Sequence, residues 1–378
     1  MTTALPANTH SADTPSQNTH SGNTHSGNTH SGNTPAFRIR RAGMMTTLQD
    51  MGRIGNQHRG MTAAGAMDTL AFRIANALVG NPVETGAREV GFLGPEFSVE
   101  ATSARIAVGG NVQVLLTPVA TPDVKKPLKP WQSHTVSKGD VITIGSVTET
   151  AFCYLAVAGG FDIPDLMGSQ STYTRAGIGG FEGRTLADGD VIALHQDTAP
   201  QSSDLMAETP PVYGSGPILV VLGPQDDYFT KDAIQTFLSE PFPISQEADR
   251  MGQRLEGPKL QHADGFDIPS DGIAKGSIQV PGTGHPILLL SDHQTVGGYP
   301  KIATIISADI PRASQMRPGM IYQFTSVTVA EAEAARRAQE DALTKLISGL
   351  KPALPDGGID LDALQEANLI SGAVDALS

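Results

Sequence analysis

Cysteine is almost absent from this sequence: Cys153 is the only one among 378 residues. No internal disulfide can form, and no cysteine-based zinc site can be built. Such scarcity fits a reducing compartment, so we expect a cytoplasmic protein. Cys153 itself lies in an apolar stretch, where a small buried thiol is more usual than a reactive nucleophile. We therefore expect it to belong to the core.

Positive charge is also scarce. Lysine and arginine number 26 against 39 aspartates and glutamates, which gives a net charge of −13 and a pI near 5.1. General binding to a phosphate backbone needs a basic surface, so no nucleic-acid partner is expected. No run approaches the roughly 18 apolar residues of a membrane span. The first residues also lack the basic and apolar segments of a secretory signal. We expect no membrane partner.

Glycine and proline are abundant, and with 41 and 26 residues they make up about 18% of the chain, against roughly 12% on average. This composition favours many turns between short strands. Helices are predicted at residues 67–80, which Asp68 or Thr69 can cap, from Thr230 onward, with Thr230 as the cap, and at 330–350. Segments rich in valine, isoleucine and leucine predict strands at 105–108, 112–116, 141–144, 152–158, 191–194, 218–222, 277–280, 287–290, 302–306 and 320–324. The prediction is a mainly β fold with short helices.

Composition also suggests four parts. Residues 1–36 contain an Asn-Thr-His-Ser-Gly repeat that can bury little apolar surface, so we expect a disordered tail whose histidines hold no metal. Residues 201–216 are rich in serine, proline and glycine and would form a linker or crossing loop. The predicted boundaries are 1–36 for the tail, 37–205 and 206–327 for two strand-rich domains, and 328–378 for a helix with an acidic tail.

Common catalytic motifs are missing. The sequence has no Gly-x-x-x-x-Gly-Lys-Ser/Thr, His-Glu-x-x-His or Gly-x-Ser-x-Gly segment. The glycines at 177–183 do not have the spacing of a dinucleotide-binding loop. Pattern alone therefore leaves the chemistry open.

Three polar loops are candidates for a site, although each could equally be an ordinary turn. The segment 47–53 places a glutamine, an aspartate and an arginine beside a glycine, and 166–172 offers hydroxyl and backbone donors that could hold an anion. The segment 249–252 adds an arginine. From these loops we predict Asp50 and Arg53 as catalytic residues, and Gln49, Ser169, Ser171, Thr172 and Arg250 as substrate-binding residues.

The densest polar cluster is residues 291–301, which lies between two predicted strands. Two glycines there let the backbone approach a ligand closely. Lys301 is a compact cation that could neutralise charge developing on a substrate oxygen, so replacing it by alanine should lower activity about a hundredfold. We expect folding to survive, because a lysine on a glycine-rich loop should carry little core burial. From this region we predict Lys301, Tyr299 and Gln294 as catalytic, and Gln279, Thr295, Gly297 and Gly298 as substrate-binding.

Several strings in this sequence resemble one family. They include TLQDMGRIG, IANALVGNP, LMGSQST, DRMGQRLEGP and SDHQTVGGYPKIATII. The chain resembles the biotin-dependent carboxyltransferase family, also described as allophanate hydrolase subunit 2 or KipA-like, which includes one of the subunits of the prokaryotic ATP-dependent 5-oxoprolinase. The resemblance extends over about residues 37–324.

The resemblance implies two cyclophilin-like β-barrel domains in tandem. It also implies a small-molecule substrate and two partner chains, one KipI-like and one of the lactam-utilisation type. With ATP, used by the complex, they would open 5-oxo-L-proline to L-glutamate. One alternative is a biotin-dependent carboxyltransferase component acting on urea or a related amide. Because no biotin-acceptor Ala-Met-Lys-Met segment occurs here, another chain would have to supply the biotin. The other alternative is a non-catalytic regulator that binds a kinase inhibitor.

Overall fold

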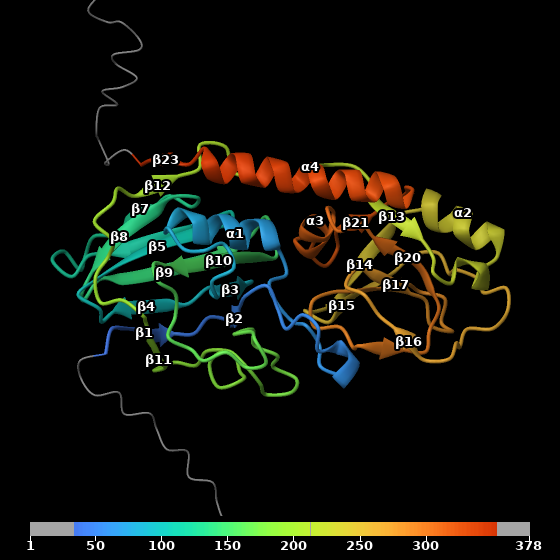
Figure 1. Ribbon diagram of the computed structural model, residues 1–378, viewed down its shortest axis with the longest axis horizontal. Helices are drawn as coiled ribbons and strands as arrows, with labels where there is room; N and C mark the ends of the chain where they lie inside the picture. Colours follow the sequence, from blue (N-terminus) through green and yellow to red (C-terminus); the bar gives the residue numbers. More distant parts are fainter. Residues whose placement is uncertain (1–33, 212, 354–378) are drawn as a thin grey trace, which may run out of the picture. The chain divides into compact units, whose positions relative to one another are not determined.

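The computed structural model describes residues 34–211 and 213–353 (Figure 1). The predicted N-terminal repeat and nearly all of the acidic tail lie outside these residues. The described chain is mainly β, as predicted, with several sheets and a few helices. None of its helices is both long and apolar enough to cross a bilayer.

The first half contains two antiparallel sheets that share one core. The core between them is apolar and includes Phe37, Phe97, Ile106 and Leu155. The first sheet has the order β11 (Val191–Ala193), β1 (Ala36–Arg41), β4 (Glu96–Val99), β9 (Val141–Val147), β6 (Val112–Thr117) and β7 (Lys126–Leu128). The second has the order β2 (Met45–Gln49), β3 (Ala87–Gly91), β10 (Phe152–Val157), β5 (Ser103–Gly109) and β8 (Ser133–Ser137).

Strand β10 is buried on both faces, because successive side chains point to opposite sides of a sheet. Cys153 and Leu155 enter the core between the sheets, and burial raises the pKa of this thiol. Tyr154 packs in the other direction, in the same cluster as residues of α1 (Thr69–Leu78). This helix lies beside β10 (Figure 1). The carboxylate of Asp68 caps α1 by accepting hydrogen bonds from the first-turn amides. Both the core position of Cys153 and this cap agree with the predictions.

The second half is one nearly closed sheet of eight strands. Its order is β21 (Ile321–Tyr322), β14 (Phe242–Ala248), β15 (Gly252–Leu255), β18 (Ile287–Leu289), β17 (Ser277–Gln279), β20 (Lys301–Ile305), β13 (Ile218–Leu222) and β22 (Phe324–Ser326). The first and last strands of this order are separated in sequence by Gln323 alone. The chain therefore passes from one edge of the sheet to the other within a single residue, which curls the sheet into a barrel. The single strand predicted at 320–324 is wrong: Tyr322 pairs with Phe242, whereas Phe324 pairs with Ile218.

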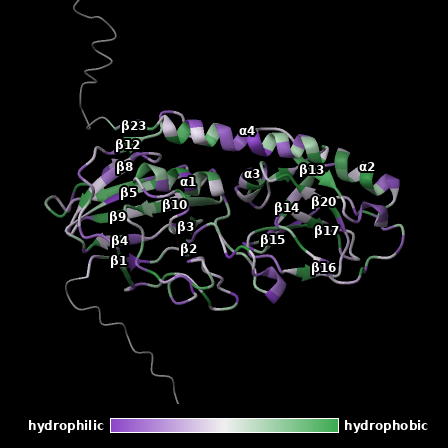
Figure 2. Cartoon of the chain, viewed as in Figure 1, coloured by the Kyte–Doolittle hydropathy of each residue, from purple (hydrophilic) through white to green (hydrophobic). Residues whose placement is uncertain are grey.

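Helices pack against strands of the barrel, and one of them also reaches the first half. α2 (Lys231–Ser239) is capped by Thr230, as predicted, and α3 (Ile310–Ser314) follows β20. α4 (Val329–Ser348) packs on β13 and reaches α1, where Glu340 binds Arg73 at 2.8 Å. Hydrophilic and hydrophobic residues are mixed along α4 (Figure 2), as expected for a helix of which only Leu343 is buried.

Short elements complete the fold. β12 (Leu205–Met206) pairs with β23 (Lys351–Pro352), so the segment predicted as a linker contains a strand. β16 (Asp271–Gly272) pairs with β19 (Val296–Gly297) beside the barrel. The single turns η1 (Gln57–Arg59) and η2 (Asp226–Tyr228) lie in loops. Apart from β12 and β23, the described strands pair within their own half, and the exact domain boundaries remain a prediction.

Candidate functional site

Two of the predicted loops meet in the first half. The Asp50 carboxylate accepts hydrogen bonds from the hydroxyls of Ser169 at 2.7 Å and Ser171 at 2.5 Å, and from the amide of Gln170 at 2.6 Å. The Thr172 amide and hydroxyl both donate to the Leu48 carbonyl, at 2.8 and 3.0 Å. Ser169, Ser171 and Thr172, which were expected to bind substrate, therefore form hydrogen bonds that join the two loops to each other.

Arg53 and Gln49 lie fully buried beside this cluster. Arg53 donates to the carbonyls of Leu166, at 3.1 Å, and Ser171 rather than to Asp50. Burial lowers the pKa of Arg53, while the nearby carboxylates of Asp50 and Asp292 oppose that shift. Within the described chain, Arg53 Nη1 and Gln49 Oε1 have no hydrogen-bond partner. The two loops form an interlocked structural unit rather than an open pocket.

Arg250 is also engaged by the protein itself. Its guanidinium donates to both carboxylate oxygens of Asp292, at 2.9 and 3.0 Å, to the Gly65 carbonyl at 2.8 Å, and to Glu89. Burial disfavours the charge, but Asp292 and Glu89 outweigh it, so the pKa of Arg250 is raised. Glu89 lies on β3 and Asp292 follows β18, so this triad joins the two halves. The predicted role in binding substrate does not fit this geometry.

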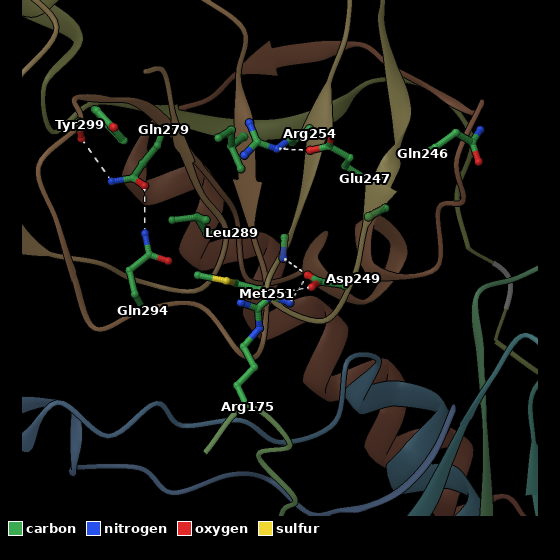
Figure 3. Close-up of a pocket in the computed structure, with 13 residues that line it drawn as sticks. Arg175, Gln246, Glu247, Asp249, Met251, Arg254, Gln279, Leu289, Gln294 and Tyr299 are labelled. Atoms are coloured by element: carbon green, nitrogen blue, oxygen red, sulfur yellow. Dashed lines mark hydrogen bonds and ion pairs between the residues drawn. The ribbon is translucent and has the colours of Figure 1, made fainter. Parts of the chain in front are cut away.

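The main cavity near the predicted residues lies on the second half and has a volume of about 470 Å³ (Figure 3). Three predicted residues line it: Gln279 from β17, and Gln294 and Tyr299 from the loop between β18 and β20. The other lining residues come from the strands and turns around it and from one loop of the first half. They are Arg175, Gln246, Glu247, Ala248, Asp249, Met251, Gly252, Arg254, Ile287 and Leu289.

The three predicted residues form a hydrogen-bonded row along one wall (Figure 3). Gln294 Nε2 donates to Gln279 Oε1 at 3.3 Å, and Gln279 Nε2 donates to the Tyr299 carbonyl at 3.3 Å. This arrangement leaves the buried oxygen Gln294 Oε1 without a partner among the described residues. The Tyr299 residue is 41% exposed. This acceptor is itself buried, whereas the adjoining tyrosine carries a hydroxyl that can donate.

The charged residues of the cavity form two exposed ion pairs. Arg254 binds Glu247 at 2.6 Å on neighbouring strands, and Arg175 binds Asp249 at 2.8 Å. Since the two pairs cancel, the cavity has no net charge. None of these four residues was predicted for the site, although Asp249 lies in the candidate segment 249–252, because single charges in strands and turns resemble solvated surface positions. Two of them, Asp249 and Arg254, stand in the string DRMGQRLEGP, which was the available signal.

Lys301 does not line the cavity and is not on an exposed loop. It is the first residue of β20, is only 2% exposed, and donates from Nζ to Asp271 Oδ2 at 2.8 Å. The expectation that Lys301 carries little core burial is therefore wrong. The hydrogen bond from Lys301 is the main reason why the pKa of Asp271 is lowered.

The remaining predicted residues act through their backbone. The carbonyls of Thr295 and Gly298 accept hydrogen bonds from Ile273 at 3.1 Å and Ile268 at 2.9 Å, and Gly297 pairs with Asp271. A Cβ atom at Gly297 would lie 2.6 Å from Gln279 Nε2, so a larger residue there would displace the amide end of the Gln279 side chain. None of the three lines the cavity, but they lie in the sequence between Gln294 and Tyr299, which do.

We found no cluster of three or more histidine, cysteine, aspartate or glutamate side chains able to hold a metal ion within residues 34–211 and 213–353.

Comparisons with known proteins agree with this architecture. Residues 59–326 match the family described as "Carboxyltransferase domain, subdomain A and B". The chain is 36% identical to the 5-oxoprolinase subunit designated C in Escherichia coli over 305 residues, which cover 80% of this chain and 95% of that protein. It is 30% identical to a urea amidolyase of Lachancea kluyveri, covering 83% of this chain but 18% of that protein. The crystal structure of Kluyveromyces lactis urea carboxylase superposes with a TM-score of 0.76 at 28% identity, covering 86% of this chain and 30% of that one. On this evidence the chain belongs to the carboxyltransferase domain family, subdomain A and B.

Proposed function

We propose that this chain is a subunit of an ATP-dependent 5-oxoprolinase complex that opens 5-oxo-L-proline to L-glutamate. The observation that supports this most is the match along 95% of the E. coli 5-oxoprolinase subunit. A protein named as one subunit implies others, and we propose two partner chains, one KipI-like and one of the lactam-utilisation type. Activity would then require all three chains.

The cavity of the second half is the proposed binding site for the lactam. The cavity combines apolar side chains with convergent polar groups, and both kinds of contact are used by small-molecule sites. Leu289 and Ile287 supply apolar surface for a five-membered ring. Gln294 Oε1, which has no partner among the described residues, would accept the lactam N–H after a turn of its side chain toward the cavity, and the Tyr299 hydroxyl would donate to the lactam carbonyl. These roles would orient the amide bond that is to be broken.

ATP does not fit the same cavity. A triphosphate needs an excess of positive charge, whereas the two arginines of the cavity are each paired with a carboxylate. The buried ammonium of Lys301 is likewise held by Asp271. We therefore propose that ATP, which would activate the amide by phosphorylating its oxygen, binds to one of the partner chains. The part of this chain would be to bind and orient the lactam.

A second candidate is a biotin-dependent carboxyltransferase component acting on urea or a related amide. The superposition on K. lactis urea carboxylase, with a TM-score of 0.76, favours it. The same Gln294 acceptor could bind a urea N–H. Any biotin would have to be carried by another chain.

Reconstitution separates these candidates. The purified chain should release no glutamate from 5-oxoproline and ATP by itself, and should do so after both partner chains are added. The same mixtures should be offered urea, bicarbonate and a biotinylated carrier protein. ATP-dependent turnover of 5-oxoproline by the isolated chain would contradict the need for partners. Consumption of urea but not of 5-oxoproline would replace the first candidate by the second.

A further inference from the structure

We infer that Asp271 is a positioning residue: together with Lys301 it fixes the loop that presents Gln294 and Tyr299 to the cavity. The consequence for substrate depends on the proposed function, but the structural role does not. Asp271 lies outside the cavity, so it would act on substrate only through this loop.

The contacts converge on one carboxylate. Asp271 Oδ2 accepts hydrogen bonds from Lys301 Nζ at 2.8 Å and from Gln225 Nε2 at 3.1 Å. Gln225 in turn accepts a hydrogen bond from the Lys301 amide at 3.1 Å. Strand β20, the loop before η2 and strand β16 are therefore tied together at a single point.

Strand β16 transmits this restraint to the cavity. Asp271 pairs with Gly297, and Gly272 pairs with Val296. Both partners lie between Gln294 and Tyr299 in the sequence, so β19 has one cavity residue on either side. A shift of β16 would therefore move both ends of the hydrogen-bonded row. Gly297 also packs against the Gln279 amide, so the third member of the row would shift as well.

Asp271 can fix the position of this loop, although it is exposed, because it compensates the charge of a buried lysine. The Lys301 side chain is 2% exposed, whereas that of Asp271 is 51% exposed. A buried ammonium that loses its carboxylate is left uncompensated, which strongly disfavours the arrangement around it. Without Asp271, the loop would have to open and admit water to the ammonium. Lys301 would then also influence substrate binding indirectly, by holding Asp271 and the loop in place, since its Nζ donates to Asp271.

The test compares Asp271→Asn with Asp271→Glu and with a control, Asp267→Asn. Asp267 is an exposed aspartate of the same loop with no side-chain hydrogen bond in the described structure. Amide hydrogen exchange on the isolated chain should be about tenfold faster at residues 294–299 in Asp271→Asn. In the reconstituted complex its KM for 5-oxoproline should rise about tenfold while kcat changes less than about threefold. Asp271→Glu should recover part of both effects, and the control should show neither.

Two results would overturn the inference. One is Asp271→Asn with unchanged exchange at residues 294–299. The other is a large fall in kcat at constant KM, which would make the ion pair part of the chemistry itself. If the wild-type complex does not turn over 5-oxoproline, the proposed function fails, and hydrogen exchange alone still decides whether Asp271 positions the loop.

Discussion

The buried Arg250 side chain holds together two carboxylates, Glu89 and Asp292, that lie far apart in the sequence. Glu89 also accepts hydrogen bonds from the Tyr154 hydroxyl at 2.7 Å and the Met67 amide at 2.8 Å. Removing the central arginine would leave two carboxylates buried with no cation between them. Breaking a buried ion pair in this way is much more harmful than replacing the whole pair.

We therefore expect Arg250→Ala to lower the free energy of unfolding by about 3–5 kcal/mol. The control is Arg254→Ala, which removes an exposed ion pair with Glu247 and should cost less than about 1 kcal/mol. Urea denaturation of both variants under the same conditions provides the comparison. Equal losses would show that the triad contributes no more than a surface pair.

For individual residues, the success of a prediction depended on where their partners lie in the sequence. Gln294 and Tyr299 are near in sequence and lie within one loop, so their proximity could be predicted. Arg250 was predicted to bind substrate and Lys301 to be catalytic, because the carboxylates that pair with them cannot be recognised from the local sequence. Glu89 is 161 positions from Arg250, and Asp271 becomes a neighbour of Lys301 only through the pairing of short strands. Whether a charged group is free depends on tertiary contacts that local patterns do not contain.

Among the elements, those with strong local signals were predicted well. Asp68 and Thr230 are N-cap residues in the structure, as their side chains and positions suggested. Apolar strands such as β10 and β13 were also found. By contrast, β14 and β15 were missed because they carry polar and charged residues toward the cavity. The split at Gln323 could not be seen, since the hydrophobic pattern continues through it.

At the start of α4, Thr328 and Glu331 form a reciprocal capping box. Replacing Thr328 by alanine should cost about 1 kcal/mol, because an amide of the first turn loses its acceptor. The chemical denaturation midpoint should fall accordingly. Ser348→Ala, near the other end of the helix, is a suitable comparison and should change the midpoint much less. No difference between the two variants would mean that the cap contributes little to stability.

At the scale of the whole molecule, the segment before α1 is held by side chains from the second half. Lys275 Nζ donates to the Ala66 carbonyl at 3.0 Å, and Ser291 Oγ donates to the same carbonyl at 3.3 Å. Burial, with a further contribution from Arg250, lowers the pKa of Lys275 to about 8. The folded protein thus releases this proton more easily than an unfolded chain does.

This shift predicts a dependence of stability on pH. Between about pH 8 and pH 10.5 the unfolded chain keeps a proton that the folded chain has released, so stability should rise with pH in that window. Relative to Lys275→Met, the free energy of unfolding should increase by on the order of 1–2 kcal/mol, because the half-buried side chain is partly screened. Lys259→Met, at an exposed lysine, should show no such slope. A difference that stays constant or falls across the window would contradict the assignment.

The single residue between β21 and β22 also sets an order of events during synthesis. β22 pairs with β13, whose partner residues precede it by about a hundred positions, so the final seam of the barrel joins its first strand to its last. A ribosome must therefore release residues 321–326 before this half can close. Until then β13 and β14 both have open edges, which are the surfaces through which nascent chains aggregate. We therefore expect closure of the barrel, when β21 and β22 pair on either side of Gln323, to be the slowest step of folding and the one most prone to aggregation.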